Sequence, residues 1–261
     1  YNNIIKMSTI IDNTNSELNS NNDLINNINV VKDKINQTAI SIGRDPNSIK
    51  LVAVSKTKPI ENIQTLYDNG QYHFGENYFQ ELVDKAEKLP KDIKWHFIGH
   101  LQSSKASKLI RSVSNLYVIE TIDSIKLAKK LQLACETVSR DCLYVYIQVD
   151  TSLEDTKSGV LAEEVIPLVQ EIINECPNLK IKGVMTIGAP GDLSCFDKLI
   201  QCRNDLANYL SINPSELDVS MGMSGDYEEA IVRGATSVRV GSTIFGARIY
   251  PNKTIHLMEE V

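Results

Sequence analysis

The sequence lacks the features that mark several classes of protein. No apolar run approaches the roughly 18 residues of a membrane span, and the amino end lacks the basic-then-apolar order of a secretory signal. The five cysteines form no Cys-x-x-Cys pair and no zinc-type spacing with histidine, and their odd number argues against a disulfide framework. We therefore expect a soluble protein of the reducing cytoplasm, with a mitochondrial pool as an additional location.

Positive charge is also scarce. The chain has 27 Lys and Arg residues against 33 Asp and Glu, a formal net charge of -6, and no long basic stretch. Nucleic acid is therefore not an expected partner. Apolar residues, in contrast, are plentiful: 42% of the 261 residues are hydrophobic, which fits one large globular domain or two small ones.

Residues 1–22 are rich in Asn and Ser and have few apolar anchors. Such a segment buries too little surface to offset the entropy of ordering, so we predict a flexible amino-terminal tail. From Leu24 onward, apolar residues recur at helical spacing as far as Ile35, and Gly43 and Pro46 are stop signals. A helix is therefore expected at the start of a single folded domain over residues 23–261.

Short β-rich runs then alternate with amphipathic helical patterns, which is typical of parallel strands joined by helical crossovers. This pattern predicts a single (β/α)₈ TIM-type barrel preceded by one helix. The alternative is an open doubly wound sheet, which is disfavoured because no Gly-x-Gly-x-x-Gly turn follows the first strand. The expected strands are residues 51–55, 71–74, 95–98, 116–119, 143–149, 180–186, 217–220 and 237–240.

Lys56 lies just after the apolar part of the segment LVAVSKTKP, residues 51–59. At this point a buried strand is expected to give way to a turn. A lysine held against apolar neighbours loses hydration, which favours the nucleophilic free amine that condenses with an aldehyde. Lys56 is thus a candidate Schiff-base lysine. The alternative is a solvated lysine that only ends the strand.

Two glycine and hydroxyl segments follow the last two expected strands. Residues 222–226 contain Ser224 and lead into a helical pattern, and Gly241 and Ser242 open a second one. Glycines let the backbone approach an anion closely, and free N–H groups at helix starts point outward. These loops commonly form the phosphate site of a TIM barrel. The alternative is a plain helix cap at Ser224 and a simple turn at Gly241.

Arg239 lies within the last apolar strand, where a guanidinium needs a partner to offset its desolvation. One interpretation is an ion pair with a carboxylate inside the barrel. The other places Arg239 beside a heteroaromatic ring nitrogen, which a protonated arginine keeps unprotonated by donating a hydrogen bond.

Three further residues at strand ends invite assignment. Asn77 either contacts a ligand hydroxyl or caps the helix that follows it. His96, alone in an apolar strand, is predicted to be a hydrogen-bonded core residue rather than a general base. His100 is expected near the rim, and none of the three is assigned a catalytic role.

Five segments occur together and in order: AVSKTKP at 53–59, FGENY at 74–78, WHFIG at 95–99, GMS at 222–224 and VRVG at 238–241. Together they resemble the pyridoxal phosphate homeostasis protein family, also called YggS or PROSC. The resemblance runs from about Leu24 to Tyr250 and includes shorter runs such as residues 101–102 and 157–159.

The resemblance implies a barrel similar to the amino-terminal domain of alanine racemase, of the fold type III class, carrying pyridoxal 5′-phosphate (PLP). Lys58 is expected to point away from the pocket and is not the expected Schiff-base residue. The cofactor-binding residues that the resemblance implies are Lys56 through a Schiff base, Asn77 in the pocket wall, Arg239 at the pyridine nitrogen, and Ser224, Gly241 and Ser242 at the phosphate.

Members of this family are regarded as carriers or regulators of vitamin B6 without established turnover, so the implied role is PLP homeostasis, with PLP-dependent apo-enzymes as recipients. The alternative is a weakly active PLP-dependent amino-acid racemase. We do not expect an enzyme, because alanine racemase borrows a tyrosine through a further domain and the 20 residues after Gly241 leave no room for one. A Schiff-base aldolase without the vitamin is a further alternative. A monomer is favoured over a dimer.

Overall fold

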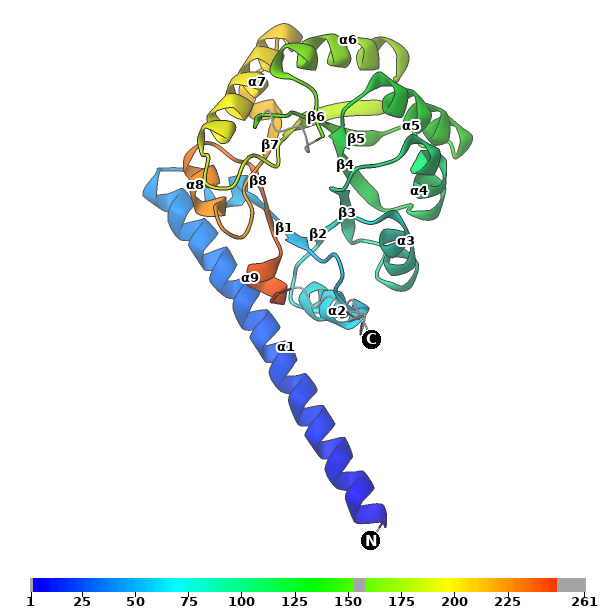
Figure 1. Ribbon diagram of the computed structural model, residues 1–261, viewed down its shortest axis with the longest axis vertical. Coiled ribbons are helices and arrows are strands. Elements are labelled where there is room, and N and C mark those ends of the chain that lie inside the picture. The colour runs from blue at the N-terminus through cyan, green and yellow to red at the C-terminus, as the bar shows by residue number, and fades with distance from the viewer. Residues whose placement is uncertain (1, 153–157, 248–261) are drawn as a thin grey trace, which may run out of the picture.

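Eight parallel strands form a closed barrel in which each strand pairs with the next in sequence and the last pairs with the first (Figure 1). This computed structural model describes residues 2–152 and 158–247. The barrel confirms the fold predicted from the sequence. Its strands are β1 (Lys50–Val54), β2 (His73–Glu76), β3 (Lys94–Phe97), β4 (Leu116–Ile122), β5 (Leu143–Gln148), β6 (Leu179–Met185), β7 (Asp218–Ser220) and β8 (Ser237–Val240).

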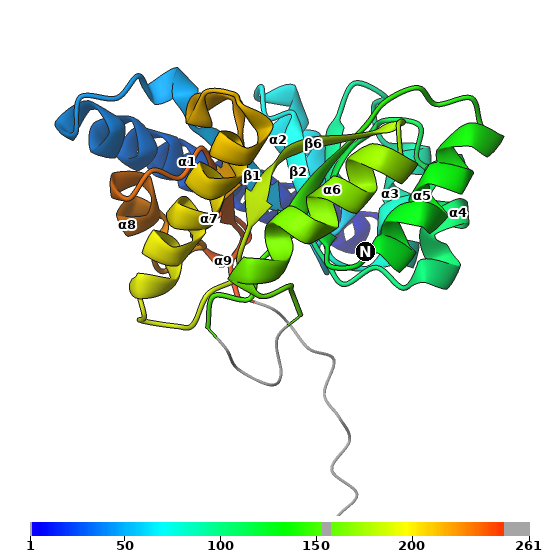
Figure 2. The ribbon, with the colours of Figure 1, turned by 90° about the horizontal axis from the view of Figure 1, so that it is seen from above.

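Helices surround the barrel, and α4 and α5 lie on the side opposite α1 and α8 (Figure 2). No helix in the described part of the chain is both long and apolar enough to cross a membrane. The helices are α1 (Asn2–Ser41), α2 (Ile60–Asp68), α3 (Phe79–Lys88), α4 (Ala106–Ser112), α5 (Ile125–Thr137), α6 (Val165–Glu175), α7 (Ser194–Leu210), α8 (Tyr227–Val232) and α9 (Ser242–Phe245), with short 3₁₀ turns at Pro46–Ser48, Ser103–Lys105, Ala162–Glu164 and Pro214–Glu216.

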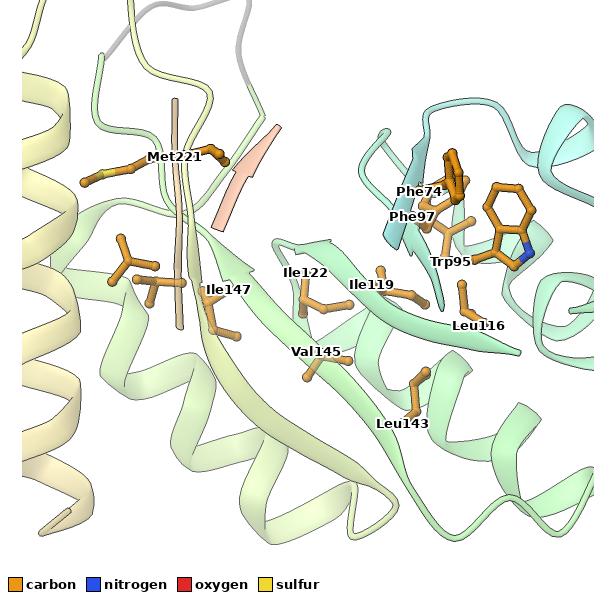
Figure 3. Close-up of a cluster of buried hydrophobic side chains, with 14 of the residues drawn as sticks. Phe74, Trp95, Phe97, Leu116, Ile119, Ile122, Leu143, Val145, Ile147 and Met221 are labelled. Atoms are coloured by element: carbon orange, nitrogen blue, oxygen red, sulfur yellow. The ribbon is translucent and has the colours of Figure 1, made fainter. Parts of the chain in front are cut away.

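The main core lies between the strands and the surrounding helices. Alternate strand residues face outward, so the branched and aromatic side chains of β3, β4 and β5 pack against the helical layer (Figure 3). Trp95, Phe97 and Ile119 are almost completely buried there. Other strand residues face the barrel interior, where Val118, Tyr146 and Met185 form a second, smaller cluster.

The long helix α1 contacts α2, α8 and α9 through its carboxyl-terminal half. Its buried residues run from Leu24 to Ala39 at helical spacing, as the sequence predicted. Asn27 Nδ2 also donates a hydrogen bond of 3.1 Å to the carbonyl oxygen of Ile244 in α9. The amino-terminal half of α1 extends away from the barrel (Figure 1). The flexibility predicted for residues 1–22 stays a prediction.

Two strands differ from their predicted bounds by more than one residue. Strand β2 begins at His73 and runs to Glu76, two residues later than expected, and β4 continues beyond residue 119 to Ile122. In both cases the added residues include a glutamate, Glu76 or Glu120, that is fully buried. A buried carboxylate in a strand is not indicated by apolar periodicity, because its partners come from distant parts of the chain.

Candidate functional site

A cavity of about 300 Å³ opens where the carboxyl ends of the strands converge. This is the face of a (β/α)₈ barrel that holds functional sites. The structure brings all six residues predicted to bind the cofactor into its wall, and their binding roles remain predictions. The lining residues are Val54, Lys56, Lys58, Asn77, Ile98, Met185, Ile187, Met223, Ser224, Gly225, Arg239, Gly241, Ser242 and Gly246.

Lys56 lies two residues beyond the end of β1 and is half-buried in this cavity. Its two chain neighbours are held firmly. The Ser55 hydroxyl donates a 2.6 Å hydrogen bond to Glu76 Oε1, and the Thr57 N–H donates one of 2.6 Å to Glu81 Oε1. Thr57 has a φ of 63°, a left-handed conformation that is uncommon for a β-branched residue. The turn that carries Lys56 is therefore fixed by side chains from β2 and α3.

Lys85 of α3 joins these contacts into one buried cluster. Its Nζ donates to the carbonyl oxygen of Ser55 at 2.8 Å, to Glu76 Oε1 at 2.7 Å and to Glu81 Oε1 at 2.6 Å. Burial raises the pKa of Glu76 to about 7, and the opposing effects of Lys85 and Ser55 do not cancel this. Glu76 Oε2 has no hydrogen-bond partner although it is buried.

Lys58 also lines the cavity, which corrects the prediction that it points away. The segment is a turn and not an extended strand, because Thr57 is left-handed and the Lys58 N–H donates a 3.1 Å hydrogen bond to the Ser55 carbonyl oxygen. Lys58 Nζ donates a 2.9 Å hydrogen bond to the carbonyl oxygen of Ala247. Partial burial lowers the pKa of Lys58. A second amine is thus present beside Lys56.

The loops after β7 and β8 meet at Ser224. Its hydroxyl oxygen accepts hydrogen bonds from the N–H groups of Gly241, at 3.2 Å, and Thr243, at 3.3 Å. Ser224 therefore caps α9 from a distant loop and not the helix that follows it in sequence. A Cβ atom at Gly241 would lie 3.3 Å from the carbonyl oxygen of Val54, so β1 approaches this turn closely. Donor groups from two loops are consequently gathered at one end of the cavity.

Arg239 lies at the inner wall and is only 4% exposed. Its Nη1 donates to the Ser220 hydroxyl oxygen at 2.7 Å, and its Nη2 donates to the carbonyl oxygen of Thr186 at 2.8 Å. Burial lowers the pKa of Arg239, while the charges of Glu120 and Asp226 act in the opposite direction. The barrel carboxylate anticipated from the sequence is Glu120, which Arg239 reaches through Ser220.

Asn77 does not cap the helix that follows it. Helix α3 begins at Phe79, and its cap residue is Tyr78, which makes no side-chain capping bond. Asn77 Oδ1 is buried and has no hydrogen-bond partner, although the residue lines the cavity. A Cβ atom at Gly99 would lie 2.0 Å from the Asn77 carbonyl oxygen, so only glycine permits this close approach. An unpaired buried acceptor at a cavity wall is a position for a ligand donor.

Comparison with known proteins places this chain in a family. The family model described as "Alanine racemase, N-terminal domain" matches residues 24–249. The pyridoxal phosphate homeostasis protein of Homo sapiens is 43% identical over 240 residues, which cover 87% of each chain. The protein of the same name from Schizosaccharomyces pombe is 44% identical over 227 residues, 85% of this chain and 91% of its own. The chain belongs to the pyridoxal phosphate homeostasis protein family.

Solved structures agree with this assignment. PipY of Synechococcus elongatus, in a structure with PLP bound, is 31% identical with a TM-score of 0.67, over 81% of this chain and 100% of PipY. An alanine racemase from Corynebacterium glutamicum, at 18% identity and a TM-score of 0.64, covers 87% of this chain and 61% of its own. The racemase shows the shared barrel fold, and the PipY structure shows a relative that holds PLP.

Some features of this pyridoxal phosphate homeostasis family member were not singled out from the sequence. Ile98 and Met185 supply the apolar wall of the cavity, and both stand at the carboxyl end of a strand, which is the signal that could have found them. Glu120 is the more informative omission. An acidic residue within the apolar run of residues 116–122 is unusual for a buried strand and could have indicated a partner for Arg239.

The histidines were placed correctly. His96 is fully buried and hydrogen-bonded, 2.5 Å from Glu120 and 2.9 Å from His73, which confirms the prediction of a core residue. His100 is exposed at the rim, with its Nδ1 3.6 Å from Asp123 Oδ2. The run at residues 157–159 lies partly outside the described residues, since Lys157 is among those not described.

Proposed function

We propose that this protein binds pyridoxal 5′-phosphate in the cavity at the carboxyl ends of the strands and holds it as a Schiff base on Lys56. Bound PLP supplies an aldehyde that condenses with an amine and a pyridine ring that withdraws electrons. The observation that carries the proposal is the gathering of an amine, a buried guanidinium and a glycine and hydroxyl turn around one cavity.

The residues present fit the cofactor. The unpaired Asn77 Oδ1 offers an acceptor for the ring hydroxyl, and the cavity volume of about 300 Å³ is of the size of small-molecule sites. Ser224, Gly241 and Ser242 hold the phosphate. Its oxygens would replace the Ser224 hydroxyl as acceptor for the N–H groups of Gly241 and Thr243. Arg239 donates a hydrogen bond to the pyridine nitrogen. The PLP bound in PipY supports PLP as the ligand.

We infer a role in PLP homeostasis without turnover. Racemisation needs an acid–base group on each face of the planar adduct, and among the described residues that line the cavity there is no tyrosine. The names of the relatives support a role in homeostasis. We therefore propose that this protein is a PLP carrier, with PLP-dependent apo-enzymes as recipients.

Spectroscopy combined with peptide mapping tests the Schiff base. Purified protein incubated with PLP is expected to be yellow, to lose its visible band on borohydride reduction, and to carry the reduced pyridoxyl group on the peptide that contains Lys56. Lys56→Ala is expected to be colourless. Lys58→Ala is the matched control, a second amine in the same cavity, and is expected to stay yellow.

An adduct on Lys58, or a wild type that stays colourless with PLP, overturns the assignment, and the second result favours an aldolase that uses no vitamin. The role is tested separately by incubating loaded protein with an apo-enzyme and with L-alanine. Transfer to the apo-enzyme without D-alanine supports the carrier. Rapid formation of D-alanine supports the racemase instead.

A further inference from the structure

A continuous series of hydrogen bonds crosses the barrel interior behind the cavity. Arg239 Nη1 lies 2.7 Å from Ser220 Oγ, and Ser220 Oγ lies 2.6 Å from Glu120 Oε2. On the other side, Glu120 Oε1 lies 2.5 Å from His96 Nδ1, and His96 Nε2 lies 2.9 Å from His73 Nδ1. The five side chains come from β8, β7, β4, β3 and β2. No segment of local sequence links them, so the barrel fold alone brings them together.

The direction of donation along this series follows from elementary chemistry. A guanidinium only donates, so Ser220 accepts from Arg239 and its own hydroxyl hydrogen goes to Glu120. An ionised carboxylate only accepts, so His96 carries its hydrogen on Nδ1. Neutral His96 then has a bare Nε2, which must accept from the Nδ1–H of His73. Every bond therefore points toward Glu120, which is the single final acceptor.

The charge states support this direction. Burial tends to raise the pKa of Glu120, but the bond from His96, the charge of Arg239 and the bond from Ser220 outweigh it and lower the pKa below its usual range. Burial lowers the pKa of His96. Burial, together with His96, Lys50 and Lys94, lowers that of His73 to about 2. Glu120 is thus an anion beside neutral histidines.

Arg239 is accordingly held by two contacts that differ in kind. The Thr186 carbonyl fixes one end of the guanidinium, and Ser220 connects the other end to the Glu120 charge. These bonds use one N–H on Nη1 and one on Nη2 of the five available. Because the guanidinium is planar and rigid, fixing two donors fixes the direction of the remaining ones.

We propose that Glu120 is the positioning residue of the cofactor site: through Ser220 it orients Arg239 and directs a guanidinium N–H at the pyridine nitrogen of PLP. This inference rests on the proposed function and adds two residues that do not touch the cofactor. Without the Glu120 charge, the buried Arg239 has no anionic counterpart in the series.

The test reads the ring nitrogen directly. Wild-type protein is loaded with PLP labelled with ¹⁵N in the pyridine ring, and the nitrogen chemical shift and visible spectrum are recorded. In Glu120→Gln we expect the nitrogen resonance to move toward that of free PLP and the cofactor to leave roughly tenfold faster, the effect of losing one charge-assisted hydrogen bond. Ser220→Ala should shift the resonance in the same direction.

The double variant distinguishes one pathway from two. If Glu120 acts through Ser220, the double variant shifts the resonance no further than the larger single change. Asp218→Asn is the matched control. It also exchanges a barrel carboxylate for an amide on β7, but Asp218 contacts Tyr146 and Lys50 and is not part of the series. The control should keep the wild-type nitrogen shift.

Folded, PLP-loaded Glu120→Gln and Ser220→Ala proteins with the wild-type nitrogen shift would overturn the inference. If Glu120→Gln does not fold, Ser220→Ala decides alone, because it removes one small hydroxyl and leaves both charges in place. Failure of the proposed function is recognised separately, since the wild type would then carry no reduced pyridoxyl group on the Lys56 peptide.

Discussion

At the scale of single residues, Glu76 shows how the barrel interior accommodates charge. It is fully buried, bonded to Ser55 and Lys85 through one oxygen, and unpaired at the other. Burial raises its pKa to about 7. Ser55 directly precedes Lys56 in sequence. Glu76 therefore gains or loses its proton at a hydrogen-bond partner of the residue next to the proposed Schiff-base lysine.

The raised pKa predicts a pH-dependent stability. The folded chain binds the Glu76 proton more tightly than the unfolded chain, so this stabilisation is present below pH 4.5 and is lost as the pH rises through about 7. The loss amounts to about 3 kcal/mol in the free energy of unfolding. Urea unfolding between pH 5 and 8 should show this decline in the wild type and not in Glu76→Gln.

Asp84→Asn is the control for that series, because Asp84 is an exposed carboxylate on α3 that bonds only Gln80 among the described contacts. It should follow the wild-type pH dependence. Parallel curves for the wild type and Glu76→Gln would show that Glu76 titrates alike in the folded and unfolded chains.

Sequence reasoning worked at this scale where chemistry and position coincide. Lys56, Ser224 and Arg239 carry recognisable groups at strand ends or in the last strand, and the structure gathers them at one cavity. The Asn77 capping alternative could not be decided from sequence, because it depends on where α3 begins. Glu120 was missed because its partners His96 and Ser220 lie on other strands, and only the closed barrel brings them within reach.

At the scale of elements, α1 supports the proposed phosphate end of the site. It packs on α9, the short helix that opens at Gly241 and Ser242, and Asn27 bonds the Ile244 carbonyl. The sequence predicted this helix from apolar spacing, and its buried residues match. The bounds of β2 were predicted two residues early, since Glu76 interrupts the apolar pattern and its compensation by Lys85 is not local.

Removing one anchor of α1 should therefore weaken the fold. Ile28 is 1% exposed in the core, and Ile28→Ala should lower the free energy of unfolding by about 2–5 kcal/mol through lost burial and the cavity that remains. Chemical denaturation measures the change. Val30→Ala removes apolar atoms from a residue of the same helix that is 52% exposed, and should change stability by less than about 0.5 kcal/mol. Equal losses would contradict the packing of α1 described above.

At the scale of the whole molecule, the cysteines report on the integrity of the barrel. All five are free, four are buried and Cys142 is exposed. Burial raises the pKa of Cys135, Cys176 and Cys202 and so disfavours the reactive thiolate. Absence of a Cys-x-x-Cys pair was readable from the sequence, but which thiols are buried depends on how the helices pack.

A thiol reagent should accordingly titrate one cysteine in the native protein and five after unfolding. Cys142→Ser should abolish the fast reaction and leave four slow thiols, which identifies the exposed residue. Rapid labelling of more than one thiol in the native wild type would contradict the burial of the other four.

Closure of the barrel limits how the proposed carrier could hand cofactor to another protein. Because β8 pairs with β1, the described strands leave no unpaired sheet edge on which a recipient could add a strand of its own. In the proposed carrier role, a recipient apo-enzyme would therefore approach the loops at one rim, where an amine of its own would exchange with Lys56. Recipients unrelated in fold can meet this requirement, since it asks for access to an aldehyde and not for a matching backbone.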